Sequence, residues 1–164
     1  MIPIMSDHLS WSSAVGLLII NFSTLDLLVQ DFLEDTLSSE EFEKFKERPF
    51  YERVERIKEY VGQADYSSEE RQPFGEFFRR LDPVRDLRNH IAHGLLRIGL
   101  AQDQKTWVLT LSLPRDLDGS NSPDALHLEF EELTNALSEL TALIEEFKKL
   151  TGGWSAVEEI EVNP

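Results

Sequence analysis

Residues 85–94 gather the side chains of this chain that are best suited to handling a phosphate group. The stretch holds two arginines, an asparagine and two histidines. Arginine keeps its charge and presents a planar fork to phosphate oxygens, and histidine exchanges protons near neutral pH. The stretch therefore predicts chemistry at a phosphate, with a cation that stabilises negative charge and an imidazole that transfers a proton.

This stretch has the pattern of the end of a helix. Gly94 would close the helix because glycine accepts the left-handed conformation, and His93 would lie in the last turn, where the helix dipole favours a protonated imidazole. Arg85, Asn89 and His93 follow at four-residue intervals and would form one polar row. Arg88 lies about 140° around the axis from His93, because each residue turns a helix by roughly 100°. The two would converge only through a long reach, a distorted helix end or a second copy of the chain.

Residues 88–93 read R-N-x-x-x-H, which resembles the signature of the HEPN superfamily, the higher eukaryotes and prokaryotes nucleotide-binding domains. Its members are small helical bundles, usually dimeric, and many are metal-independent ribonucleases. The resemblance spans roughly residues 12–150. It implies that Arg88 and His93 carry the chemistry, that Asn89 orients them, and that two motifs face each other across a homodimer.

The same resemblance implies a function. It is that of a metal-independent endoribonuclease without a cofactor, such as the toxin of a toxin–antitoxin or phage-defence system. RNA would be the substrate and a cognate antitoxin or another protein would be the partner. The alternative is a non-catalytic dimeric module that binds a partner protein or a nucleotide, because fold and activity do not always travel together.

The residue types leave several roles open within the motif. We assign Arg88 to the phosphate charge and His93 to proton transfer, with His90 as an alternative proton carrier. Asn89 would hold either the imidazole or the scissile phosphate. In a purely structural interpretation, Asn89 and His93 cap the helix end and Arg88 pairs with an acid. His90 and His93 are spaced to chelate a metal, but Asp86 is the only nearby third ligand, so we expect no metal site.

Composition sets the wider limits on function. The 164 residues contain no cysteine, which excludes disulfides and thiolate metal sites and fits the cytoplasm. The net charge of −15 opposes non-specific binding of nucleic acid. Residues 71–97, however, carry six arginines and three carboxylates, a net charge of +3, which leaves −18 for the rest. The longest apolar run stops at Asn21 and is short for a membrane span, so we expect no membrane association.

Hydrophobic periodicity predicts the elements that position the motif. The expected fold is mainly α, a HEPN-like bundle of four to five helices with a small β-hairpin inserted before the last helix. Serine followed by acidic residues marks two helix starts, and alternation predicts the strands. The expected segments are helices at 12–34, 38–47, 50–61, 67–93 and 131–150, and strands at 95–100, 105–113 and 125–130. Within 67–93, Pro73 would delay the start of the helix, and Pro83 would kink it or begin a separate segment. The charged positions of 50–61 would form a solvated face.

One domain accounts for most of the chain in this interpretation. We expect a flexible N-terminus at 1–11, a single helical domain at 12–151 and an acidic tail at 152–164. Asp26 falls on an apolar row of the first helix, where a buried carboxylate would need a partner. Arg85 or Arg88 would supply that partner, unless Asp26 lies at the edge of the row and meets water.

Overall fold

The computed structural model describes residues 4–64, 66–100, 106–112 and 126–152. Over these residues the protein is mainly helical, with a small antiparallel sheet whose strands lie in the order β1-β2-β3. The elements are α1 (Ile4–Thr36), α2 (Ser39–Phe45), α3 (Phe50–Gln63), α4 (Ser68–His93), β1 (Leu95–Leu100), β2 (Trp107–Ser112), β3 (Leu126–Glu129) and α5 (Phe130–Leu150). The contacts divide the chain into two compact units.

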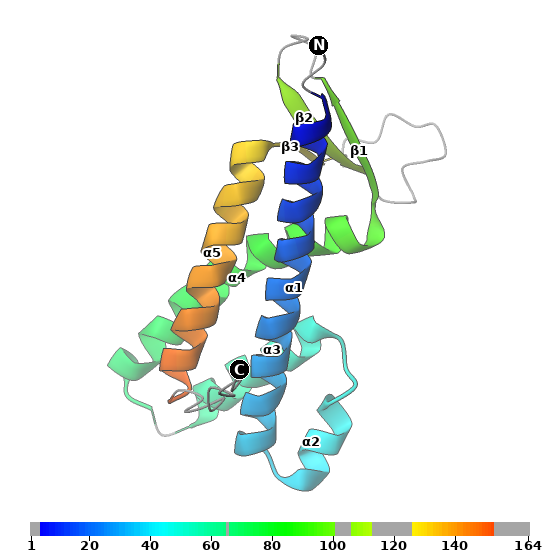
Figure 1. Cartoon of the computed structure of the whole chain (residues 1–164). Helices are drawn as coiled ribbons and strands as arrows, with labels where there is room; N and C mark the ends of the chain where they lie inside the picture. Colours follow the sequence, from blue (N-terminus) through cyan, green and yellow to red (C-terminus); the bar gives the residue numbers. More distant parts are fainter. Residues whose placement is uncertain (1–3, 65, 101–105, 113–125, 153–164) are drawn as a thin grey trace, which may run out of the picture. The chain divides into compact units, whose positions relative to one another are not determined.

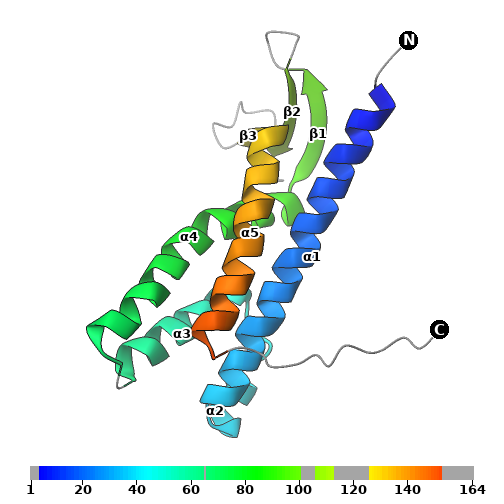
Figure 2. The same cartoon turned by 60° about the vertical axis from the view of Figure 1, so that its left-hand side comes forward.

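The first unit comprises residues 1–23 and 80–142. It holds the N-terminal part of α1, the C-terminal part of α4, the sheet and the start of α5, and Figures 1 and 2 show the sheet beside α1. Strand register explains the packing. Ile98 of β1 pairs with Leu109 of β2, which pairs with Leu128 of β3, so one face of the sheet is apolar across all three strands. Leu109 is 1% exposed, and Trp11 packs edge-on against Phe130.

The second unit comprises residues 24–79 and 143–164. Here α2 and α3 lie beside the C-terminal part of α1 (Figure 1). Phe32 of α1 contacts the rings of Tyr60 and Phe147, and Phe147 also contacts Phe77 of α4. These edge-on and tilted aromatic contacts form the centre of the core in this unit.

Serine caps begin two helices where the sequence predicts them. The Ser38 hydroxyl donates to the Glu41 carboxylate, and the Glu41 amide points back to the Ser38 oxygen. The Ser67 amide donates to the Glu70 carboxylate, and the Glu70 amide donates to the Ser67 oxygen. These hydrogen bonds lower the pKa of both glutamates, because they stabilise the charged carboxylates.

The helix that carries the motif is longer than its prolines suggest. We expected Pro73 and Pro83 to delay, kink or divide it, but α4 runs unbroken from Ser68 to His93. Each proline removes one backbone hydrogen bond, at a cost of about 3 kcal/mol in a helix interior. Buried side chains continue past both prolines and offset that cost: Phe74, Phe77, Phe78, Leu81, Val84, Leu87 and Ile91.

Other expected boundaries need correction. Helix α1 begins at Ile4, although we expected residues 1–11 to be a flexible lead-in. The insertion before α5 is a three-stranded sheet and not a hairpin alone, because β3 lies at the third strand that we expected at 125–130 and pairs with β2. The acidic tail lies outside the described residues except for residue 152.

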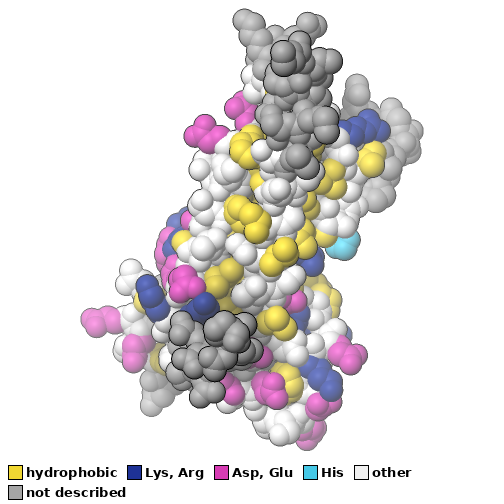
Figure 3. All heavy atoms as spheres, in the orientation of Figure 1, with side chains coloured by type: hydrophobic (Ala, Val, Ile, Leu, Met, Phe, Trp, Pro, Cys, Tyr) yellow, Lys and Arg dark blue, Asp and Glu magenta, His cyan; other side chains and the backbone are white. Residues whose placement is uncertain are grey.

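Helix α1 is more apolar than its longest uninterrupted run suggests. By length and composition alone, residues 10–36 could cross a membrane, with a mean hydropathy of 1.7 and 28% of the most apolar window buried. A core helix passes the same test, and α1 buries Leu18, Leu25 and Val29 completely. Its outer side exposes Leu17 and Ile20, and Figure 3 shows hydrophobic side chains along this part of the surface.

Candidate functional site

Arg88 lies in the first unit, where its side chain packs onto α1. The guanidinium carbon lies 5.1 Å from the centre of the Phe22 ring, a cation–π distance. Arg88 Nη1 donates to Asn89 Oδ1 at 3.1 Å. The ring and the amide therefore hold the guanidinium in one orientation, and the Asn89 amide nitrogen remains as a further donor.

Two other arginines of this unit, Arg80 and Arg85, behave differently. Arg80 Nε contacts Glu139 at 2.6 Å, and Arg85 contacts Asp82 at 3.0 Å and Asp86 at 3.1 Å. Carboxylates therefore compensate the charges of Arg80 and Arg85. Arg88 has no carboxylate partner in the part of the chain that the structure describes. The structural interpretation, in which Arg88 pairs with an acid, does not hold for these residues.

His93 is the last residue of α4 and is exposed. The helix continues through residues 88–93 without a break, so the expected rotation of about 140° between Arg88 and His93 applies. Arg88 is directed to Phe22, whereas His93 contacts none of the described residues through a hydrogen bond or ion pair. The structure therefore does not bring Arg88 and His93 together within one copy of the chain. Among the described residues, no hydrogen bond links Arg85, Asn89 and His93, which we expected to form one polar row.

Gly94 closes the helix for a reason that differs from our expectation. Its φ is not positive, because the positive-φ glycine among the described residues is Gly152. The Gly94 amide donates to the His90 carbonyl oxygen at 2.8 Å. A Cβ at Gly94 would lie 2.3 Å from that oxygen and 3.2 Å from the Ser112 carbonyl oxygen. Glycine is required here by the close approach of two backbone segments.

Gly94→Ala should therefore lower the free energy of unfolding by about 2 kcal/mol or more, because backbone must shift to admit the methyl group. Urea unfolding followed by circular dichroism measures the change. Gly99→Ala is the matched control, since nothing lies within 4 Å of its added Cβ, and its effect should stay below ~0.5 kcal/mol. Equal effects of the two substitutions would contradict this account of Gly94.

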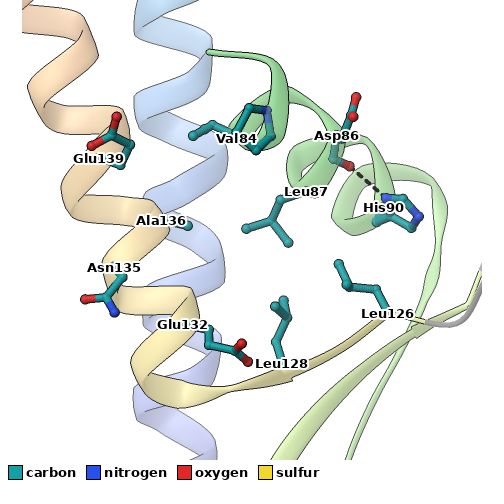
Figure 4. Close-up of a pocket in the computed structure, with 11 residues that line it drawn as sticks. Val84, Asp86, Leu87, His90, Leu126, Leu128, Glu132, Asn135, Ala136 and Glu139 are labelled. Atoms are coloured by element: carbon teal, nitrogen blue, oxygen red, sulfur yellow. Dashed lines mark hydrogen bonds between the residues drawn. The ribbon is translucent and has the colours of Figure 1, made fainter. Parts of the chain in front are cut away.

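His90 borders an open pocket of about 650 Å³ between α4, β3 and α5, and its ring lies beside Leu126 (Figure 4). His90 Nδ1 lies 2.8 Å from the Asp86 carbonyl oxygen. A carbonyl oxygen can only accept, so Nδ1 carries a proton and Nε2 is the acceptor of the neutral ring. The floor of the pocket is apolar and its border polar. The lining includes Val84, Leu87, Leu126, Leu128, Ala136, Asp86, Glu132 and Glu139.

Asp26 belongs to the second unit and pairs with neither Arg85 nor Arg88, so our expectation of its partner is wrong. Its Oδ1 lies 2.5 Å from Arg53 Nη2, and Arg53 Nη1 donates to Gln30 at 3.1 Å. The Asp26 side chain is 35% exposed and that of Arg53 only 8%. The partner comes from α3, whose charged positions we had interpreted as a solvated face.

The sheet assembles polar side chains that the linear sequence did not indicate. Arg97 lies opposite Thr110, and Thr110 lies opposite His127. Thr110 Oγ1 and His127 Nδ1 are 3.0 Å apart. The alternation of β1 and β2 was visible, but the register that aligns these three residues follows only from the pairing of the strands.

Comparison with protein families, curated proteins and solved structures found no match to this chain. Among the described residues, no group of three or more His, Asp or Glu side chains could hold a metal ion. The argument for function therefore rests on the contacts that residues 88–93 make in the structure.

Proposed function

We propose that this protein is a metal-independent endoribonuclease of the HEPN type that acts as a homodimer. The observation that carries the proposal is the uncompensated charge of Arg88. A guanidinium that has no acid partner among the described residues, and that a ring and an amide hold in place, is prepared to receive an anion. The motif around it supplies a histidine for proton transfer, and the phosphodiester of RNA is the anion on which such a pair acts.

The 2′-hydroxyl of the substrate would be the nucleophile. His93 would move a proton between that hydroxyl or the leaving oxygen and solvent, and Arg88 would stabilise the charge that develops on the phosphate. The Asn89 amide nitrogen, on the side chain that already orients Arg88, would donate to a phosphate oxygen.

A second copy of the chain would complete the site. Arg88 is directed to Phe22 and His93 lies about 140° away on the same helix. A two-fold axis beside the end of α4 would place Arg88 of one copy and His93 of the other at the same phosphate. This arrangement needs no distortion of the helix.

The test is RNA cleavage by the purified chain in excess EDTA, beside Arg88→Ala and His93→Ala prepared identically. We expect cleavage by the wild type and none by either variant. Mixing the two variants after subunit exchange should restore about a quarter of the activity, because half the dimers would contain one intact composite site. A metal requirement, or equal activity in all three proteins, would overturn the proposal. No activity in any of them, with a stable dimer, would favour the non-catalytic binding module.

A further inference from the structure

The pocket between α4, β3 and α5 is separate from the chemistry of Arg88, although His90 of the motif forms part of its wall. Figure 4 shows Leu87, Leu126 and Leu128 converging on its floor, with Glu132 beside Leu128 and the His90 ring beside Leu126. The parts of α4, β3 and α5 that line it all belong to the first unit. The pocket therefore offers a preformed apolar cavity with polar groups at its border.

The charge at that border is negative. Glu132 uses Oε2 to accept from the Glu129 amide at 2.7 Å, and Asp86 uses Oδ1 to pair with Arg85. Glu132 Oε1 and Asp86 Oδ2 keep no partner among the described residues. Arg80 compensates Glu139, and Arg85 is shared between Asp82 and Asp86. The net charge around the apolar floor is therefore −2. It comes from four carboxylates (Asp82, Asp86, Glu132 and Glu139) and two arginines (Arg80 and Arg85).

Such a border excludes a phosphate-bearing ligand and favours a cation, since opposite charges attract across a partly desolvated rim. We infer that this pocket is a docking site for a partner protein segment that inserts a leucine or phenylalanine side chain between flanking lysines or arginines. The apolar side chain would fill the space above Leu87 and Leu128. The flanking cations would meet Glu132 on α5 and Asp86 on α4. This binding activity does not depend on the ribonuclease proposal.

The probe is a short fluorescein-labelled peptide with leucines at helical spacing and lysines between them. Its control has the same leucines with glutamates in place of lysines. Fluorescence anisotropy with the full-length protein should show saturable binding of the lysine peptide that weakens with salt, and none of the glutamate peptide. Failure of the lysine peptide to bind would overturn the inference, as would equal binding of both peptides.

Two pairs of variants locate the binding. Ala136→Trp fills the pocket and should abolish binding, whereas Ala142→Trp, on an exposed part of α5, should not change it. Glu132→Gln keeps an acceptor for the Glu129 amide but removes the charge, and combined with Asp86→Asn it should weaken binding by about tenfold. Glu131→Gln, next to Glu132 but outside the pocket, should leave affinity unchanged. Affinity lost equally in test and control variants would refute the pocket as the site.

A last experiment tests whether the pocket binds nucleic acid instead of a protein segment. It uses an RNA oligonucleotide with 2′-deoxy substitution, which can bind but cannot be cleaved. Labelled with fluorescein and measured without the peptide, it should bind the wild type and Ala136→Trp with equal affinity. Binding of the oligonucleotide that Ala136→Trp abolishes would show that the pocket holds nucleic acid and would overturn a protein partner.

Discussion

Replacing Arg88 with lysine should slow RNA cleavage by about 100- to 1000-fold, with kcat affected more than KM, because lysine keeps the charge but loses the planar fork. In the structure the planar guanidinium group makes two contacts that lysine could not make together. It stacks over Phe22 and reaches Asn89 Oδ1 with Nη1. An ammonium group would be a mobile point charge in that position. Initial rates on a defined oligonucleotide measure the effect.

Arg97→Lys is the control for Arg88→Lys. Arg97 is exposed on β1 and makes no ion pair with the described residues. Its conservative replacement removes the same fork from the same unit, so general loss of RNA attraction would affect both variants alike. We expect the rate with Arg97→Lys to stay within about twofold of the wild type, since rim charges contribute little to a transition state. A fully active Arg88→Lys would show that the planar fork is not needed at this position and would contradict the prediction.

Asp26→Ala should lower the free energy of unfolding by about 3 kcal/mol, because it leaves the buried Arg53 guanidinium without its carboxylate. Arg53 is 7% exposed overall, and its Nε is already buried without a partner among the described residues. Gln30 would remain as one neutral acceptor. Urea denaturation gives the value, and the reduced stability should come without a change in the slope of the transition.

Replacing Arg53 instead of Asp26 shows how much of the loss in stability comes from the burial of each partner. Arg53→Met should cost only about 1 kcal/mol, since Asp26 is 35% exposed and can be hydrated when its partner is gone. Glu40→Ala breaks the exposed pair with Lys44 and should change stability by less than about 0.5 kcal/mol. Equal losses for Asp26→Ala and Arg53→Met would mean that burial does not decide the cost.

The sequence predicted the helices well where local rules act. Both serine caps, the apolar rows of α3 and α4, and strand β1 lie where periodicity and capping indicate. Local rules failed at Pro83, because packing of the apolar face of α4 outweighs a lost hydrogen bond. They also failed at the start of α1, where we interpreted residues before the strongest periodicity as a lead-in.

The candidate site was less predictable because its contacts are non-local. The sequence singled out Arg88, but it did not indicate that Phe22 lies beneath it or that no described acid pairs with it. Asp26 could be recognised as needing a partner, yet Arg53 was hidden among ordinary surface charges of α3. The pocket beside His90 depends on how β3 packs against α4 and α5, which no spacing within the chain reveals.

Helix α4 and strand β1 are joined by a single residue, so the number of residues between them cannot change without altering the strand. His93 ends the helix, Leu95 begins the strand, and Gly94 alone separates them. Because strand side chains alternate, one inserted residue would turn β1 over, moving Arg97 to the α1 side and Ile98 to the outside. Chains that descend from a common ancestor with this one should therefore keep an identical residue count from the motif to the end of β1, and tolerate insertions and deletions elsewhere.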